Sequence, residues 1–423
     1  MAHDGWRRAF AVDNGTSNKL TTFCAAEQNL QKRKLMGDVN FNEALRREIS
    51  VSIRNSHEKN WDEGERGPEP VPVGLPVLRR IATPVRQAAA RTKAIWLDYV
   101  RPLGIDLVRL LWPSLEYRLK LGRYKGVGYL YDRLEDEESK NLLVKLFAFR
   151  AMGHRKVRLP RSDANYWINI QRVENLNIVG PSVSVEFMNL VLELRDLRSI
   201  DFDMQAYCTG RGGSYVFLQR QYELHRETAH CQADPGDVVI DAGGCWGETA
   251  LYFAHQVGSQ GKVISYEFIP SNLRVLDRNL AVNPQLADTI TVVRQPLWST
   301  EDQTLYYVDW GPGSRVSFAK MREDFPDTQC STTTIDVTVE REKLQRLDFI
   351  KMDIEGAELS ALKGCEKSLK RFHPKLAISL YHSVEDFKSI PRYLDSLGLR
   401  YKFYLEHHTI YENETLLFCI PQK

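Results

Sequence analysis

The chain has 423 residues, enough for two or three domains, and 43% of them are apolar, as in ordinary globular proteins. Its 57 Lys and Arg against 55 Asp and Glu leave a formal charge of +2, which excludes bulk electrostatic attraction to nucleic acid or to an anionic membrane. Seven scattered cysteines without a C-x-x-C pair argue against a disulfide framework or a zinc module, and we find neither a secretory signal nor an 18-residue apolar run. We therefore expect a cytoplasmic protein without a membrane span and without a nucleic-acid partner.

Residues 1–76 are predicted to form a flexible N-terminal arm and linker. They are polar and weakly patterned, with one amphipathic helix candidate at 42–53. The stretch 61–76 (WDEGERGPEPVPVGLP) holds four prolines and three glycines, and each residue before a proline is biased away from helix. Few contacts are expected to cross such a linker.

Residues 77–230 are predicted to form an α+β region, helical first and then stranded. The basic segment 77–125 fits either an anionic-surface patch or a solvated helical face, and the absence of a nucleic-acid-binding motif favours the solvated face. Apolar residues at helical spacing over 136–152, followed by Gly153, predict a helix. Segment 204–224 has β-favouring residues around a predicted Gly-Arg-Gly-Gly turn.

Residues 231–423 alternate strands with helices, which predicts an α/β domain. The predicted strands are 237–241, 262–268, 289–294, 347–353 and 375–381, and the predicted helices are 247–256, 271–282, 357–370 and 384–397. Successive βα units pair in parallel through right-handed crossovers, so we expect a doubly wound sheet. Segments 400–406 and 415–420 should close it as an antiparallel hairpin, and 305–308 with 315–318 suggest an inserted hairpin near the adenine end of the cofactor.

The loop after the first of these strands reads Asp241-Ala-Gly-Gly-Cys-Trp-Gly247. Small residues there let the backbone approach a ligand at a helix N-terminus, but the first glycine of a dinucleotide fingerprint is replaced by Ala242. A carboxylate at the strand end favours a ligand with a sulfonium or amino group over a pyrophosphate. Glu267, at the end of the second strand, can accept both hydroxyls of a ribose.

Acidic residues and a histidine follow the fourth and fifth strands. Asp353, Glu355 and Glu358 come after the fourth strand, and His382 comes after the fifth. Ligands bind at this edge of open α/β sheets, so His382 is a candidate proton acceptor beside Asp353, although such a histidine is as readily a structural group. The acids could also complement the helix dipole, or hold a divalent cation, but we assign no residue as a metal ligand.

Four sequence segments resemble a known family: VVIDAGGCWGETALYFA, KVISYEFIPSNLRVLDRNLAVNP, LDFIKMDIEGAELSALKG and PKLAISLYH, followed by the closing ETLLFCIP. Over residues 235–421 the chain is similar to the FkbM family of S-adenosylmethionine-dependent methyltransferases. The resemblance implies a Rossmann-like class I methyltransferase fold with S-adenosyl-L-methionine as cofactor. It also implies methyl transfer to a hydroxyl oxygen, often of a sugar or secondary metabolite, so a small-molecule or glycan acceptor is expected.

The resemblance also implies roles for individual residues. The expected cofactor-binding residues are Asp241, Gly243, Gly244, Cys245, Trp246, Gly247, Glu267 and Asp353. Many members have asparagine at the position of Cys245, and Trp246 is bulky for this loop. The expected catalytic residues are His382 as base, Asp353 to orient it or the acceptor, and Glu355. Two alternatives stay open, a non-catalytic adenosyl-binding or scaffold protein and a nicotinamide-dependent oxidoreductase.

Overall fold

The computed structural model describes residues 40–52, 55, 124–318 and 328–422. The predicted proline-rich linker at 61–76 and the basic segment up to residue 123 lie outside these ranges. Within the described ranges, every helix is too short or too polar to cross a membrane.

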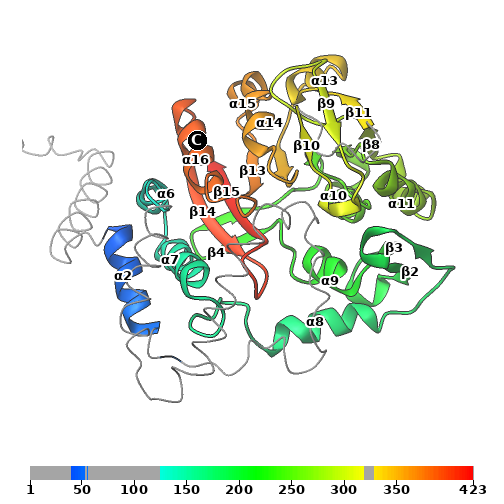
Figure 1. Ribbon diagram of the computed structural model, residues 1–423. Coiled ribbons are helices and arrows are strands. Elements are labelled where there is room, and N and C mark those ends of the chain that lie inside the picture. Colours follow the sequence, from blue (N-terminus) through cyan, green and yellow to red (C-terminus); the bar gives the residue numbers. More distant parts are fainter. Residues whose placement is uncertain (1–39, 53–54, 56–123, 319–327, 423) are drawn as a thin grey trace, which may run out of the picture.

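A seven-stranded sheet forms the centre of the protein, in the order β14-β15-β13-β12-β6-β7-β8 (Figure 1). Its strands are β6 (Val238–Ala242), β7 (Lys262–Tyr266), β8 (Ile290–Val293), β12 (Phe349–Met352), β13 (Lys375–Ser379), β14 (Tyr401–His407) and β15 (Thr415–Pro421). The first five pair in parallel, whereas β15 runs antiparallel to both β13 and β14. The predicted Rossmann-like sheet with a closing hairpin is confirmed.

Helices follow the parallel strands as the alternating pattern predicted. They are α10 (Glu248–Val257), α11 (Pro270–Ala281), α12 (Pro284–Ala287), α13 (Ile335–Arg341), α14 (Glu358–Lys363), α15 (Glu366–Phe372) and α16 (Asp386–Ser396). The single helix predicted over 357–370 is instead two, α14 and α15. A Cβ at Gly364 would lie 2.1 Å from the backbone oxygen of Trp298, and Cys365 leaves helical dihedrals, so tight packing ends the first helix there.

Helix α7 (Glu137–Met152) packs against β14, and helix α2 (Phe41–Ser52) packs in turn on α7 and on α6 (Gly128–Arg133) (Figure 1). The predicted helices at 42–53 and 136–152 are thereby confirmed. However, Phe41, Leu45 and Ile49 share one face of α2 and are buried in the same core as the sheet. The expectation of an arm with few contacts is therefore wrong for α2, because its apolar face has a partner in α7. Residue 76 lies outside the described residues, so the domain boundary there stays a prediction.

Residues 160–231 pack on the opposite side of the same sheet and contain α8 (Ala164–Glu174), β1 (Val183–Ser184), β2 (Val191–Asp196), β3 (Gln205–Cys208), β4 (Leu224–Arg226) and β5 (Ala229–Cys231). The Gly-Arg-Gly-Gly segment is not the predicted turn between strands. It forms α9 (Gly210–Gly213), which continues into a π-helical turn over Ser214–Leu218. Thr209 caps this helix by accepting the Gly212 N–H at 2.9 Å, and Gly213 packs closely on Val173 of α8.

The predicted inserted hairpin is present between β8 and β12. Strand β9 (Thr304–Tyr307) pairs antiparallel with β10 (Val316–Ser317) and with β11 (Thr328–Ser331). The loop between β9 and β10 reaches α11, where Asp309 accepts the backbone N–H of Ser271 at 3.0 Å. This carboxylate, rather than a residue of α11 itself, occupies the helix N-terminus.

Candidate functional site

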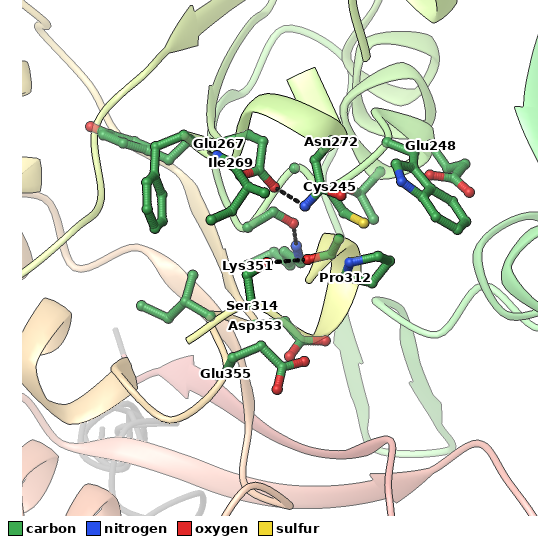
Figure 2. A pocket seen from close by; sticks show the side chains of 18 of the residues that line it. Cys245, Glu248, Glu267, Ile269, Asn272, Pro312, Ser314, Lys351, Asp353 and Glu355 are labelled. Carbon is green, nitrogen blue, oxygen red and sulfur yellow. Dashed lines mark hydrogen bonds between the residues drawn. The ribbon is translucent and has the colours of Figure 1, made fainter. Parts of the chain in front are cut away.

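A cavity of about 300 Å³ lies at the carboxyl edge of the parallel strands (Figure 2). Its floor comes from residues 243–246 after β6, residues 266–269 at the end of β7 and residues 353–355 after β12. Tyr381 after β13 and Glu414 before β15 extend the floor on one side. The strand order therefore sets a sequence of groups along the edge, from Glu414 through Tyr381 and Asp353 to the glycine loop and Glu267. The volume and position suit a small-molecule site.

The glycine loop is shaped by close backbone contacts. Gly243 has φ +89, and a Cβ there would lie 2.0 Å from the carbonyl oxygen of Asp353. The N–H groups of Gly243 and Gly244 both donate to the Tyr266 carbonyl, at 3.1 and 2.9 Å. Gly247 has φ +94 where the loop enters α10. These glycines are required because the loop is pressed between the ends of β7 and β12.

Cys245 and Trp246 line the cavity from the same loop. Cys245 takes a left-handed conformation at φ +48, which is uncommon for this residue type. Trp246 is only 6% exposed and packs with Leu192 and Leu194 of the N-terminal strand β2. Its carbonyl accepts the Asn279 amide at 2.8 Å. The bulky tryptophan therefore also anchors the loop to the N-terminal region.

Asp241 does not line the cavity, although the sequence suggested it as a cofactor ligand. Its side chain is 0% exposed and accepts hydrogen bonds from Thr249 Oγ1 at 2.9 and 3.0 Å and from Ser265 Oγ at 2.9 Å. It also forms an ion pair with Lys351 Nζ at 3.0 Å. In this geometry Asp241 supports the glycine loop from below, and its predicted role as a cofactor ligand stays a prediction.

Lys351 is a site residue that the sequence analysis did not identify. It is 1% exposed in the middle of β12, and besides Asp241 its ammonium donates to the carbonyls of Ala242 and Gly243, at 3.1 and 2.5 Å. Its Nζ also lies 5.4 Å from the centre of the Tyr222 ring. The sequence did hold a signal for it: a lysine within an apolar strand is expected to be buried, and a buried charge needs a partner of opposite charge or a hydrogen-bond acceptor.

Glu267 lines the cavity as predicted, at the opposite side from Asp353 and Glu355 (Figure 2). Its carboxylate accepts the N–H groups of Phe268 and Ile269 at 2.6 and 2.7 Å and the Asn272 amide at 3.0 Å. Burial raises the pKa of Glu267 to about 7, against these hydrogen bonds. The carboxylate is thus held in a fixed orientation.

Two further polar groups on this side were missed from the sequence. Asn272 is 2% exposed and lines the cavity, and its side-chain Oδ1 has no hydrogen-bond partner. Glu248, at the first turn of α10, also lines it, and burial raises its pKa to about 7. An unpaired buried oxygen and a set of carboxylates fit a ligand that has hydroxyl and amino donors and a sulfonium charge, as S-adenosylmethionine has.

Asp353 lines the cavity at the end of β12 and is held by a neighbour. The Tyr381 hydroxyl donates to its two oxygens at 3.0 and 3.2 Å. Glu355, with φ +57, lines the cavity as well, and the Arg315 Nε lies 3.8 Å from its carboxylate. The structure thus brings the predicted residues Asp353 and Glu355 together at the cavity.

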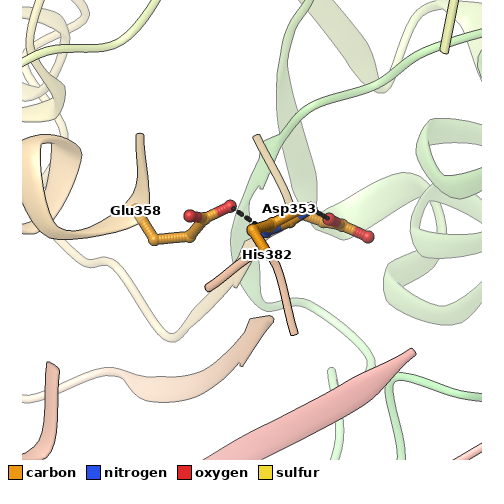
Figure 3. A group of neighbouring side chains, drawn as sticks. All are labelled: Asp353, Glu358 and His382. Carbon is orange, nitrogen blue, oxygen red and sulfur yellow. Dashed lines mark ion pairs between the residues drawn. The ribbon is translucent and has the colours of Figure 1, made fainter. Parts of the chain in front are cut away.

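His382 lies behind Asp353 and does not line the cavity. Its Nε2 is 3.4 Å from Asp353 and 3.7 Å from Glu355, and its Nδ1 is 3.1 Å from Glu358 (Figure 3). Burial opposes a charge on the ring, but the carboxylates of Glu355, Glu358 and Asp353 outweigh it and raise the pKa of His382 to about 11. A ring that stays protonated at neutral pH has no free nitrogen lone pair, which argues against His382 as general base, and that role stays a prediction.

The same cluster can also be read as a set of metal ligands. Asp353, Glu358 and His382 each offer one ligand atom within 4.8 Å of the others. However, the two ring nitrogens face different carboxylates, one on each side of the ring (Figure 3). This arrangement fits an imidazolium between two carboxylates, and it fits equally a neutral ring that binds a metal through one nitrogen and donates its other N–H to a carboxylate.

Three comparisons relate this geometry to known proteins. Residues 230–401 match the model of the methyltransferase FkbM domain. The methyltransferase sdnD of Sordaria araneosa is 25% identical over 180 residues, which cover 36% of this chain and 67% of that protein. The solved structure of the methyltransferase FkbM from Methylobacillus flagellatus is 21% identical with a TM-score of 0.43, over 73% of this chain and 60% of that one.

A further solved structure is the fibrillarin of Aeropyrum pernix in complex with natively bound S-adenosyl-L-methionine, 14% identical with a TM-score of 0.30 over 44% of this chain and 68% of that one. The chain spans 60% of the length of the solved FkbM protein. Both the family model and the sdnD relative are methyltransferases, which confirms the methyltransferase interpretation over the alternative of a nicotinamide-dependent oxidoreductase. Residues 230–401 thus match the methyltransferase domain of the FkbM family, whose members use S-adenosylmethionine.

Proposed function

We propose that this protein transfers a methyl group to a hydroxyl oxygen of a sugar or secondary-metabolite acceptor. The observation that carries the proposal is the position of Asp353, which lines the cavity between the glycine loop and Tyr381. S-adenosylmethionine supplies an electrophilic methyl group and leaves as S-adenosylhomocysteine. The protein then has to align the acceptor oxygen with that methyl group and take up one proton.

We propose that Asp353 is the group that orients the hydroxyl and accepts its proton. Its carboxylate accepts a hydrogen bond from the Tyr381 hydroxyl at 3.0 Å, and the His382 ring lies behind it with Nε2 at 3.4 Å. A carboxylate is a sufficient base because the hydroxyl proton becomes strongly acidic as the oxygen–carbon bond forms. In this proposal His382 is a positioning residue, and Glu355 contacts the acceptor.

The cofactor side is proposed to use the glycine loop, Glu267 and Asn272. Glu267 accepts the ribose hydroxyls, and the unpaired Asn272 Oδ1 accepts a further donor of the cofactor. Asp241 and Lys351 act indirectly by holding the loop.

The test is methyl transfer from isotopically labelled S-adenosylmethionine to a panel of polyols and hydroxylated metabolites. Asp353→Asn should lower turnover by about 10²–10⁴-fold while cofactor affinity stays within about twofold. The matched control is Asp288→Asn, an exposed aspartate that does not line the cavity. Turnover of Asp353→Asn within fivefold of the wild type, or a product methylated on nitrogen or carbon, would contradict the proposal.

A further inference from the structure

Three carboxylates gather at the end of the cavity away from Glu267. Asp353 and Glu355 follow β12, and Glu414 comes from the turn that leads into β15. Burial raises the pKa of Glu414 to about 8, and the charges of Asp353 and Glu355 add to this rise. The three acids therefore lie close enough to repel one another.

No basic side chain is available to neutralise this end among the described residues that line the cavity. Lys351 is the one Lys or Arg among them, and its ammonium is already engaged by Asp241 and by two backbone carbonyls. Arg315 approaches Glu355 only from outside, with its side chain 63% exposed and its Nε at 3.8 Å. His382 lies behind Asp353, where it is shared with the buried Glu358. The end of the cavity is therefore anionic toward a ligand.

The wall facing these acids is aromatic and polar. Tyr215 and Tyr222 line it from the N-terminal region, and both are less than a tenth exposed. Beside them, Gln221 is 5% exposed, lines the cavity and leaves its side-chain oxygen without a hydrogen-bond partner. A buried, unpaired acceptor atom on a cavity wall points to a ligand that donates a hydrogen bond there.

We propose that the acceptor carries a positively charged amino group, which binds between Asp353, Glu355 and Glu414 and the wall of Tyr215, Gln221 and Tyr222. Carboxylates together with tyrosine faces are a favourable surface for an ammonium group. The Gln221 oxygen would accept one of its N–H groups. This inference rests on the proposed function, because it names the chemical class of the hydroxyl acceptor as an amino sugar, aminocyclitol or similar amino alcohol.

The same charges discriminate against other acceptors. An anionic acceptor, such as a sugar phosphate or uronic acid, would meet the carboxylates of Asp353 and Glu355 and the carboxyl group of Glu414 in a largely buried space and gain no cationic partner. A neutral sugar would form hydrogen bonds but leave the repulsion among the acids unrelieved. A cation removes that repulsion on binding, so charge rather than ring shape should decide affinity.

The experiment uses matched triplets built on one scaffold: a free amine, its N-acetyl derivative and its N-succinyl derivative. Glucosamine, 2-deoxystreptamine and an aliphatic amino alcohol provide three scaffolds. Binding to the full chain saturated with S-adenosylhomocysteine is measured by ligand-observed NMR. On at least one scaffold the amine should bind at least tenfold more tightly than the N-acetyl form, and the N-succinyl form should not compete. Affinity for the amine should also fall as salt is raised.

Glu414→Gln tests the site itself, and Glu412→Gln is the matched control because Glu412 is exposed in the same turn and does not line the cavity. Glu414→Gln should weaken amine binding about three- to tenfold and leave S-adenosylhomocysteine affinity unchanged, whereas Glu412→Gln should change neither. Equal binding of the amine and N-acetyl forms on every scaffold, or no amine binding on any, would overturn the inference. Amines that bind but are methylated on nitrogen, or not at all, would support it and refute the O-methyl transfer of the proposed function instead.

Discussion

The ion pair beneath the glycine loop gives a sharp test of how the cofactor site is built. Lys351 and Asp241 are 1% and 0% exposed and lie 3.0 Å apart. Replacing Lys351 by Met leaves the Asp241 carboxylate buried without its cation and leaves the carbonyls of Ala242 and Gly243 without their donor. Breaking one partner of a buried pair costs about 3–5 kcal/mol. We expect Lys351→Met to lower the free energy of unfolding by that amount and to weaken S-adenosylmethionine binding at least tenfold.

A double-mutant cycle with Asp241→Asn separates the ion pair from other losses. The double variant no longer buries an uncompensated charge, so it should recover about 1–3 kcal/mol relative to Lys351→Met. Chemical denaturation followed by tryptophan fluorescence and calorimetric titration with S-adenosylmethionine provide the two measurements. The control is Lys363→Met, an exposed lysine on α14. A loss below 1 kcal/mol in Lys351→Met, with cofactor affinity within twofold, would refute the idea that this pair holds the loop.

Three other predictions follow from the same contacts. Glu267→Gln keeps the shape of the side chain but removes its charge, and should weaken S-adenosylmethionine binding by about 1–3 kcal/mol in calorimetric titrations, with unchanged affinity counting against a ribose contact. The pKa of His382 is raised from 6.5 to about 11, so its contribution to stability is complete below pH 6.5 and falls by about 1.4 kcal/mol per pH unit as pH rises toward 11. The difference in unfolding free energy between wild type and His382→Gln should therefore shrink between pH 7 and 9, with or without EDTA. A difference that stays constant with pH, or that EDTA abolishes, would favour a neutral ring that binds a metal. Leu45→Ala should cost about 2–5 kcal/mol because Leu45 is fully buried against α7, and a loss below 0.5 kcal/mol would instead support the predicted arm with few contacts to the rest of the protein.

The central sheet could be predicted from sequence because its signals are local. Each parallel strand is a short apolar run followed by a helical pattern, and chain connectivity then fixes the direction of pairing. The signals failed where a contact from elsewhere in the chain decides the local structure. The Gly-Arg-Gly-Gly segment reads as a turn, but its glycines allow α9 to pack on α8, and Gly364 breaks a continuous helical pattern because it lies against Trp298. A similar contact, with α7, brings α2 into the core.

The site shows the same limit for chemistry. Placing Asp353, Glu355 and Glu267 at strand ends was enough to locate them at the cavity, because strand ends meet at one edge. The direction of a side chain at that edge does not follow from its position in the sequence. Asp241 and His382 also end parallel strands, yet one is covered by Thr249 and Lys351 and the other lies behind Asp353. Gln221 and Glu414 had no motif to mark them, since they reach the cavity from the N-terminal region and from the closing hairpin.

The distribution of charge at this edge connects cofactor use with acceptor choice. Lys351 forms an ion pair with Asp241 beneath the glycine loop, and His382 lies between Asp353 and Glu358. Both basic groups therefore pair with carboxylates of the protein rather than with a ligand. The carboxylates that face the cavity are left to be matched by ligands. In the proposed binding mode the sulfonium and amino groups of S-adenosylmethionine provide positive charge on the side of the glycine loop, but Glu414 lies two strands further along the strand order than Asp353 and Glu355, which follow β12. An acceptor with its own positive charge is the complement that this arrangement lacks, which is why Glu414→Gln should reduce the preference for an amine about three- to tenfold, even though the cofactor still binds.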